Sequence, residues 1–188
     1  MGMTVQRRKD TQTPKVFMHK VADIKGGVSV KSTELGADYM PEGAVISVPE
    51  NGVCHVLKTA VVTAAVTESA KTIYVKKGSL FTTGDFVLLA TGGKASKITA
   101  IDKTGTDSDK LTVDAALGAI GAGAVLAQAK AASTDASELA YEPLALAGTG
   151  KPVLPNENID TDAWVIGVTK GNPLPDCVAA KLKGIINY

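Results

Sequence analysis

Residues 72–89 read TIYVKKGSLFTTGDFVLL, and three short stretches continue the pattern: GGKASKITAID at 92–102, LTVDAALG at 111–118 and GAVL at 123–126. Runs rich in β-branched residues alternate with Gly and Asp turns at roughly ten-residue spacing, which is typical of a small β-barrel or sandwich. No acid–base pair, nucleophile or metal-binding cluster occurs in these runs. The stretch therefore predicts a β-rich domain and favours a protein that binds over one that catalyses.

Strand and turn patterns also occur outside this stretch. Residues 41–57 predict a β-hairpin, because Asn51 and Gly52 supply the positive φ angles of a tight turn. Residues 98–113 predict a second hairpin with a polar loop. Residues 59–70 are ambiguous, since alanine favours helix, but their β-branched side chains favour strand.

The most apolar run of the chain is AWVIGVT at residues 163–169, which predicts a buried strand. Its Trp is the only one in the chain. An exposed Trp can serve as a platform for a sugar, but its place in an apolar strand favours a core position. Two further short strands are predicted at 177–180 and 183–187. The predicted core residues of the apolar run are Trp164, Val165 and Ile166.

These elements predict a mainly β protein with a split domain. A small β-barrel or sandwich domain, made of residues 25–70 and 140–188, is interrupted by an inserted β-rich domain at residues 71–139. Residues 1–24 lack sustained periodicity and contain a proline, which predicts an extended N-terminal arm. The length of 188 residues is enough for one domain of ordinary size or two small ones.

Charge is distributed unevenly along the chain. Residues 1–31 hold seven Lys/Arg against two Asp, a net charge of +5, whereas the rest of the chain holds 13 basic and 17 acidic residues, a net charge of −4. A basic arm on a mildly acidic body can dock on an acidic surface, although a solvated terminus is the alternative interpretation. The residues predicted to make such contacts are Arg7, Arg8, Lys9, Lys15, Val16, Phe17 and Met18.

Candidate sites for chemistry fail on geometry or spacing. Cys54 and His55 are neighbours, and neighbouring side chains on a strand point to opposite faces, so they cannot act as nucleophile and base. Residues 102–109 are acidic but lack the Gly and Glu positions of an EF-hand, which leaves weak calcium binding as an alternative to a solvated turn. Cys54 and Cys177 are expected to be free thiols. The sequence thus predicts no catalytic residue, no metal and no cofactor.

Nucleic-acid and membrane binding are not expected either. A groove for single-stranded nucleic acid combines basic residues with aromatic ones, but aromatic residues make up only 4% of this chain. No secretory signal is recognisable at the start. The longest uncharged stretch, residues 115–128, is too short and too rich in Gly and Ala to span a bilayer.

Several motifs, quoted with their positions, carry a resemblance to known proteins: GDFVLL at 84–89, GGKASKITAID at 92–102, DAWVIGV at 162–168 and LKGII at 182–186. Together with GAVISVPENG at 43–52, they resemble bacteriophage head-decoration and head-fibre proteins, a family of auxiliary capsid proteins. The resemblance covers roughly residues 28–188.

The resemblance implies a virion protein without enzymatic activity. It would be made in the cytoplasm of the bacterial host and bind the outer surface of the capsid, where its partner is the major capsid protein. A homotrimer that cements the shell or forms the base of a head fibre is implied, and the basic N-terminal residues would contact the capsid or a neighbouring subunit. The sequence contains no heptad or collagen-like repeat, so a long fibrous shaft is not expected.

Two other classes of protein remain open from the sequence. The first is a tail or baseplate part or a host-surface adhesive β module, which has the same strand-rich composition. The second is a small-molecule-binding barrel or an enzyme, which requires a cavity with convergent polar groups.

Overall fold

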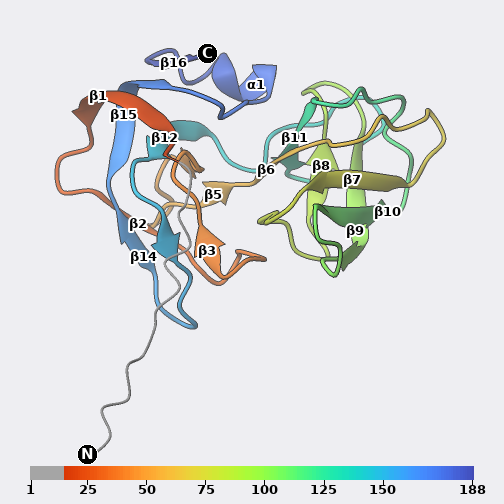
Figure 1. Cartoon of the computed structure of the whole chain (residues 1–188), viewed down its shortest axis with the longest axis horizontal. Helices are drawn as coiled ribbons and strands as arrows, with labels where there is room; N and C mark the ends of the chain where they lie inside the picture. Colours follow the sequence, from red (N-terminus) through yellow and green to blue (C-terminus); the bar gives the residue numbers. More distant parts are fainter. Residues whose placement is uncertain (1–14) are drawn as a thin grey trace, which may run out of the picture.

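The computed structural model describes residues 15–188, which form a mainly β protein of antiparallel sheets with one short helix. The strands are arranged in two lobes (Figure 1). The chain builds β1–β5 in the first lobe, crosses to the second lobe for β6–β11, and returns to the first lobe for β12–β16. The elements of the first lobe are β1 (Phe17–Asp23), β2 (Val28–Val30), β3 (Tyr39–Met40), β4 (Val45–Ser47), β5 (Val56–Leu57), β12 (Pro143–Ala147), β13 (Lys151–Pro152), β14 (Ile159–Thr161), β15 (Ala163–Thr169), α1 (Asp176–Ala179) and β16 (Ile185–Asn187).

The main sheet of the first lobe has the order β1-β15-β12-β4-β5. All of these pairs are antiparallel, whereas β16 pairs with β15 in parallel. Two small sheets, β13-β3 and β14-β2, complete the lobe. Strand β15 is therefore bordered by β1 on one side and by β12 and β16 on the other.

The second lobe is a six-stranded sheet with the order β6-β11-β8-β9-β10-β7. Its two outer strands approach each other through a single bridge between Val62 and Val75, supported by a hydrogen bond of 2.8 Å from the Thr63 N–H to the Tyr74 carbonyl. The sheet curls strongly, but it is not a closed barrel. Its strands are β6 (Thr59–Val61), β7 (Thr72–Lys76), β8 (Phe86–Leu88), β9 (Ala95–Asp102), β10 (Ser108–Val113) and β11 (Val125–Ala129).

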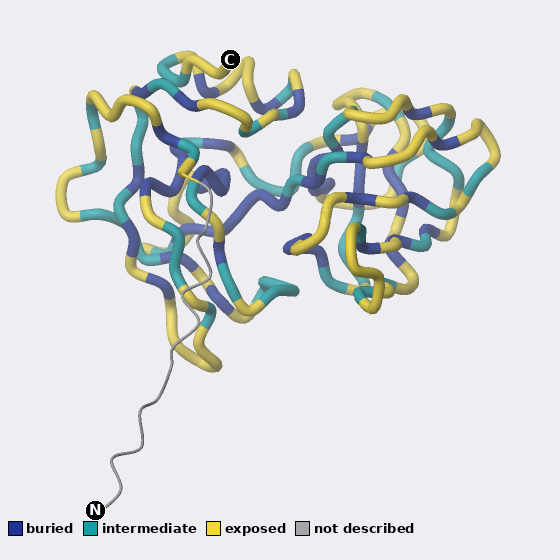
Figure 2. The backbone as a smooth tube through the Cα atoms, in the orientation of Figure 1, coloured by how far each residue is buried: buried dark blue, intermediate teal, exposed yellow. Residues whose placement is uncertain are grey.

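Each lobe has its own buried apolar core (Figure 2). In the second lobe, Phe81 packs among strand residues that include Ile98 and Leu111. Strand β7 alternates buried and exposed positions, as a strand with one face on a core does. In the first lobe, Met40 and Ile46 belong to another cluster, to which Leu80 of the second lobe also belongs.

A further apolar cluster is shared by both lobes. Val45, Leu57 and Leu146 from the first lobe belong to the same buried cluster as Leu88 and Ala127 from the second. Because this buried apolar cluster takes side chains from both lobes, the lobes are joined by apolar packing and do not touch through polar contacts alone. We therefore expect the two lobes to unfold in one cooperative transition.

The predicted hairpins are confirmed. Strands β4 and β5 pair antiparallel around a turn in which Asn51 has φ 52° and Gly52 has φ 83°. Strands β9 and β10 form the second hairpin. The apolar run at residues 163–169 is strand β15.

The prediction of a strand at residues 177–180 is wrong. Residues 176–179 form the one-turn helix α1, and the Pro175 carbonyl accepts hydrogen bonds from the N–H groups of Val178 and Ala179, both at 2.9 Å. Proline suits the start of a helix because its ring holds φ near the helical value. The strand predicted at residues 183–187 is present as β16.

The prediction of an extended arm over residues 1–24 is wrong for the part that the structure describes. Strand β1 pairs with β15, and the Phe17 side chain is buried, with its ring centroid 6.4 Å from that of Trp164. The sequence did not predict this strand, because its register with β15 shifts at three places and the shifts break the alternation of buried and exposed side chains. Residues 1–14 of the predicted arm, including Arg7, Arg8 and Lys9, lie outside the described residues.

The predicted core run of β15 also needs correction. Trp164 and Val165 are half-buried, and Ile166 is 45% exposed, so the core prediction is wrong for Ile166. The covered positions of the strand are mostly small residues, such as Gly167, where a Cβ would lie 2.9 Å from the Phe17 ring. Since side chains alternate between faces, this close approach leaves Ile166 on the more open side.

The second sheet begins earlier than the predicted domain boundary at residue 71. Strand β6 pairs with β11, and Val66 forms a bridge with Ile120, so residues 59–70 lie with the second lobe and not with the first. Their preference for strand over helix is confirmed at β6. The chain crosses between lobes directly after β5.

Candidate functional site

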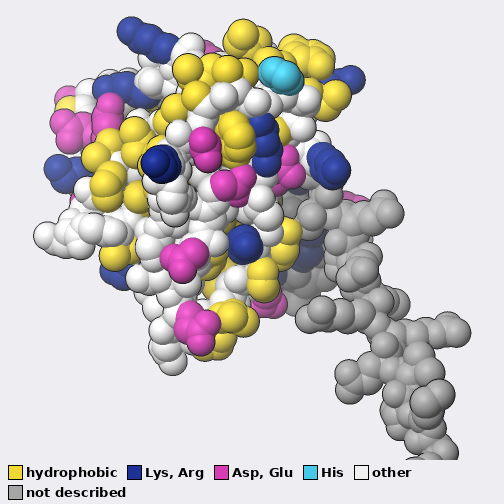
Figure 3. Space-filling view, turned by 90° about the vertical axis from the view of Figure 1, so that its left-hand side faces the viewer, with side chains coloured by type: hydrophobic (Ala, Val, Ile, Leu, Met, Phe, Trp, Pro, Cys, Tyr) yellow, Lys and Arg dark blue, Asp and Glu magenta, His cyan; other side chains and the backbone are white. Residues whose placement is uncertain are grey.

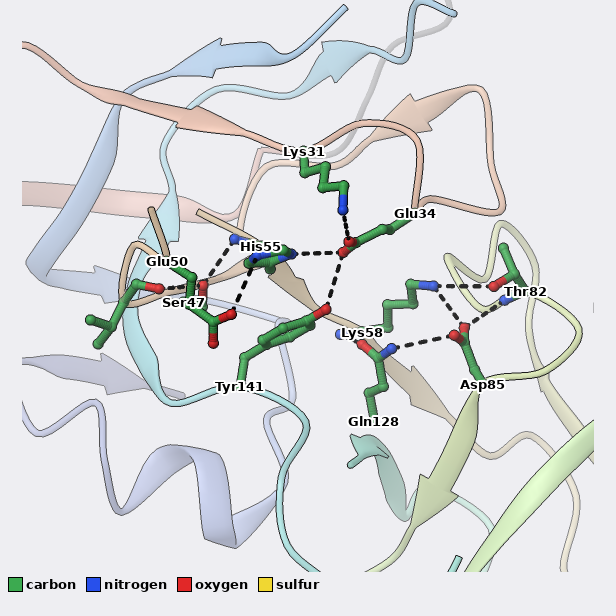
Figure 4. A network of polar contacts seen from close by, with 11 residues as sticks. Lys31, Glu34, Ser47, Glu50, His55, Lys58, Thr82, Asp85, Gln128 and Tyr141 are labelled. Carbon is green, nitrogen blue, oxygen red and sulfur yellow. Dashed lines mark hydrogen bonds and ion pairs between the residues drawn. The ribbon is translucent and has the colours of Figure 1, made fainter. Parts of the chain in front are cut away.

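The lobes meet at a network of buried polar side chains (Figure 4). Its centre is Lys58, which lies between β5 and β6 where the chain crosses to the second lobe, and which is 1% exposed. Lys58 Nζ lies 2.7 Å from Asp85 Oδ2 and donates to Thr82 Oγ1 at 3.3 Å. Both partners belong to the turn that precedes β8. The ion pair therefore holds the crossing point against the second lobe.

Other groups complete the hydrogen bonding of this ion pair. The Thr82 N–H donates to Asp85 Oδ2 at 2.8 Å, and Gln128 Nε2 donates to Asp85 Oδ1 at 3.3 Å. Gln128 Oε1 accepts the Lys58 N–H at 3.4 Å. Buried charges are tolerated only when they are paired and hydrogen-bonded, and each member of this network depends on the others.

A second group of polar side chains lies beside the first, around the buried His55 (Figure 4). His55 Nδ1 lies 2.8 Å from Glu34 Oε2, and the Tyr141 hydroxyl donates to the same oxygen at 3.2 Å. The His55 and Tyr141 rings stack with centroids 4.3 Å apart and an interplanar angle of 10°. Lys31 Nζ lies 2.8 Å from Glu34 Oε1. Glu34 thus joins three side chains from different parts of the first lobe.

The pKa of Glu34 is lowered and the pKa of Tyr141 is raised, so both values lie further from 7 than the ordinary ones. Burial alone would raise the pKa of Glu34 above its ordinary value of 4.5, but hydrogen bonds from Lys31 and His55 outweigh burial and hold the pKa below that value. Burial and the negative charge of Glu34 raise the pKa of Tyr141 to about 12. A general acid or base works best with a pKa near the operating pH. These shifts suit a clamp that holds the fold together better than a site of proton transfer.

We expect Glu34→Gln to destabilise the protein most at neutral pH. The folded pKa of Glu34 is lowered, so its stabilising contribution is present above the ordinary value of 4.5 and is lost as the pH falls through the folded value. Replacement by Gln removes the charge-assisted bonds and is expected to cost about 1–2 kcal/mol at pH 7. Urea denaturation at pH 7 and at pH 3–4 measures the difference.

The matched control is Glu68→Gln, because Glu68 is exposed. This control is expected to change the free energy of unfolding by less than about 0.5 kcal/mol. A difference between wild type and Glu34→Gln that stays constant with pH would contradict a role for the charge of Glu34.

Outside the network, the most exposed large apolar side chains of the first lobe gather on β1, β15 and β16. Met18 is 58% and Ile186 is 63% exposed, and Val21 and Tyr188 are exposed as well. Val168 lies opposite both His19 on β1 and Ile186 on β16, so the side chains of His19, Val168 and Ile186 share one face of the sheet. Figure 3 shows hydrophobic side chains near the upper end of this side of the molecule, with basic side chains around them.

The structure places the predicted contact residues in different environments. Lys15 and Met18 are exposed, whereas Val16 is half-buried and its N–H donates to Glu42 Oε1 at 3.3 Å. Phe17 points into the shared core, so its assignment as a contact residue is wrong. A sequence pattern cannot separate Phe17 from Met18 because the bulges of β1 interrupt the alternation between faces.

The structure shows what surrounds the two cysteines and the acidic stretch at residues 102–109. Cys54 and Cys177 are free thiols, as predicted, and burial raises the pKa of both. A thiol with a raised pKa is a poor nucleophile at neutral pH. In the acidic stretch, Asp109 is buried and its Oδ2 accepts the N–H groups of Gly78 at 3.1 Å and Ser79 at 2.9 Å. This carboxylate therefore holds a turn of its own lobe.

Within residues 15–188, no group of three or more His, Cys, Asp or Glu side chains is placed to hold a metal ion. None of the helices in that part of the chain is long and apolar enough to cross a membrane. A shallow hollow is lined by Gly27, Thr149, Asp160 and Asp162, none of which belongs to the polar network. No protein-family model, curated protein or solved structure matches the chain.

Sequence reasoning missed the polar network. Lys58, Asp85 and Gln128 are separated by 27 and 43 residues in the chain, so no local motif connects them. One signal was available: Lys58 interrupts the apolar run VCHVLKTAVV at residues 53–62. A lysine inside a buried apolar run requires a charged partner, but the position of Lys58 in the sequence does not show which carboxylate that is.

Proposed function

We propose that the protein is a non-enzymatic structural component of a bacteriophage virion that binds the outer surface of the capsid, where it cements the shell or forms the base of a head fibre. The observation that carries this proposal is the group of exposed apolar side chains on and beside β1, β15 and β16, in a protein whose buried polar side chains hold the lobes together. A large exposed apolar patch with a polar rim is typical of an interaction surface. The resemblance of the sequence motifs to head-decoration proteins supplies the kind of partner, the major capsid protein.

We propose that the first lobe is the split decoration-like domain and that the second lobe is the inserted domain. The return of the chain to the sheet of the first lobe after β11 supports this assignment. The protein acts as a homotrimer on the shell, because repeated weak contacts from linked copies raise avidity without new chemistry.

The proposed contacts come from the basic N-terminal residues and from the exposed part of β1. Arg7, Arg8, Lys9 and Lys15 contribute long-range attraction to an acidic surface, and Met18 contributes apolar contact. Exposed ion pairs contribute about 0–1 kcal/mol each, so the apolar contacts are expected to supply most of the affinity.

The first test is the number of copies per major capsid subunit in purified virions, measured by quantitative mass spectrometry. We expect a ratio on the order of one copy per capsid subunit, because decoration proteins follow the capsid lattice. A handful of copies per particle would favour a vertex fibre, tail or baseplate part. Absence from the virion would contradict the proposal and would favour a host-surface or small-molecule-binding role.

A binding assay tests the contact residues in the same system. Shells lacking the protein are mixed with the full chain or with the triple variant Arg7→Ala/Arg8→Ala/Lys9→Ala, and bound protein is measured after sedimentation. We expect several-fold weaker binding by the variant at low salt and a smaller difference at high salt, since salt screens exposed charges. Deletion of residues 1–24 is unsuitable as a test because it removes β1 from the sheet. Equal binding at low salt would exclude the three basic residues from the contact.

A further inference from the structure

The turn between β4 and β5 contains the only asparagine of the chain that is followed by glycine. Asn51 and Gly52 are both exposed, and their φ angles are positive, 52° and 83°. Asn-Gly is favoured in a two-residue hairpin turn because both residues tolerate this backbone conformation. The same pair is chemically reactive, because the backbone nitrogen that follows an asparagine can attack the side-chain amide of that asparagine.

The Gly52 nitrogen is accessible in the folded protein. Within residues 15–188, its N–H takes part in no hydrogen bond, whereas the Glu50 N–H donates to the Val53 carbonyl at 2.8 Å and the Val53 N–H donates to the Glu50 carbonyl at 3.1 Å. A Cβ at position 52 would have no neighbour within 4 Å, so no other part of the protein covers the turn there. The nitrogen is therefore open to water and hydroxide, and glycine has no side chain to shield it.

We propose that Asn51 deamidates spontaneously in the folded protein, which makes the turn between β4 and β5 a site of covalent modification. The Gly52 nitrogen loses its proton to hydroxide and forms a bond to Asn51 Cγ. The bond from Cγ to Nδ2 then breaks, and ammonia leaves with a proton taken from water. Water opens the resulting cyclic imide at Cγ, which gives aspartate, or at the backbone carbonyl carbon, which gives isoaspartate. Overall, one water is consumed and one ammonia is released, so no oxidant or reductant is needed.

The fold slows this reaction but does not prevent it. Attack on Cγ requires rotation of the main chain at Asn51, and the two hydrogen bonds between Glu50 and Val53 oppose that rotation. Exposed turns open locally at a small cost in free energy, without unfolding of the core. We therefore expect the reaction to be slower in the folded protein than in the unfolded chain, but to occur in both.

The aspartate product changes charge and not backbone. Aspartate tolerates a positive φ as asparagine does, so the turn is expected to persist. The product places a second carboxylate next to Glu50, whose Oε2 lies 3.9 Å from His55 Nε2 (Figure 4). The new charge therefore lies beside the polar side chains around His55.

The isoaspartate product changes the backbone itself. Its main chain passes through the side-chain carbon, which lengthens the turn by one carbon–carbon bond, about 1.5 Å. A two-residue turn joins paired strands only with the right length and twist. Isoaspartate at position 51 is therefore expected to weaken the pairing of β4 with β5. This inference goes beyond the proposed function and does not depend on it.

The test is peptide mapping by mass spectrometry after incubation of the full chain at neutral and at mildly alkaline pH, with and without urea. In the folded protein, we expect the peptide containing Asn51 to gain the mass difference between an amide and an acid, and to do so faster at the higher pH. Asn156 is the matched internal control, because it is exposed and has φ 62° but is followed by Glu. Its peptide is expected to stay unchanged over the same time.

A variant tests the role of the Gly52 nitrogen. Gly52→Asn keeps a residue that tolerates positive φ, and the open space at this position accommodates a side chain. The added side chain hinders attack by the nitrogen, so we expect deamidation at Asn51 to slow several-fold. Circular dichroism confirms that the variant is folded.

Urea denaturation of the separated products tests the structural consequence. The isoaspartate form, isolated by ion-exchange chromatography, is expected to unfold at a lower urea concentration than the unmodified protein. Asn51→Asp carries the same charge on a normal backbone and is expected to unfold close to the wild-type midpoint. An isoaspartate form as stable as the unmodified protein would contradict the effect on the hairpin.

Three results would overturn the modification site: an unchanged Asn51 peptide in the folded protein under conditions in which the chain in urea reacts, equal reaction at Asn156, or an unchanged rate in Gly52→Asn. None of these results depends on the number of copies in the virion. The modification site and the proposed function can therefore fail separately.

Discussion

Asp85→Ala is expected to lower the free energy of unfolding by about 3–5 kcal/mol. The replacement leaves the Lys58 ammonium group without its carboxylate partner in a position that is closed to water. Thr82 and Gln128 also lose their acceptor, so the loss spreads through the network. Denaturation in guanidinium chloride, followed by circular dichroism, measures the change.

The double variant Lys58→Met/Asp85→Leu is the informative control. It removes both charges together and leaves apolar side chains of similar volume, so it is expected to regain most of the stability that Asp85→Ala loses. If the double variant is as unstable as the single one, the loss comes from packing and not from an unpaired charge. A loss of less than about 1 kcal/mol for Asp85→Ala would show that the ion pair contributes little.

Phe81→Ala is expected to cost about 3–5 kcal/mol, because Phe81 is fully buried in the core of the second lobe. Phe81→Leu keeps most of the side-chain volume and is expected to cost about 1.5 kcal/mol or less. Since the lobes share an apolar cluster, both variants are expected to shift one transition that is seen equally by tryptophan fluorescence and circular dichroism.

Tryptophan fluorescence makes this a test of coupling, because Trp164 lies in the first lobe and Phe81 in the second. If Phe81→Ala shifted the circular dichroism transition but left the fluorescence transition in place, the lobes would unfold separately. That result would contradict the shared core.

The sequence predicted the second lobe better than the first, and the reason is local. Strands β9 and β10 are adjacent in the chain and alternate apolar and polar residues around a polar loop, so neighbouring residues alone specify their pairing. Strand β1 pairs with β15 more than 140 residues later, through a register interrupted by bulges. The sequences of β1 and β15 therefore contain no local pattern from which their pairing or its bulges could be predicted.

The site was less predictable than the fold. Lys58 lies where the chain crosses between the lobes, and Asp85 lies in the turn before β8. Three-dimensional packing decides which carboxylate neutralises the buried lysine. The short helix α1 was missed because four residues are too few for helical periodicity, although the proline before it marks the start. Exposure within β15 depended on the close approach of Phe17 to Gly167, which a sequence does not show.

The positions at which the chain leaves and re-enters the first lobe determine how a pulling force would pass through the protein. Thr59 and Ala127 are paired residues of β6 and β11, and the Gln128 N–H donates to the Lys58 carbonyl at 2.8 Å, so the two connections to the second lobe lie side by side. Tension applied through β1 and β16 would pass across β15, the strand that both of them border. The second lobe would lie outside the path of this force. A force large enough to separate β1 from β15 would therefore not act on the six strands of the second lobe.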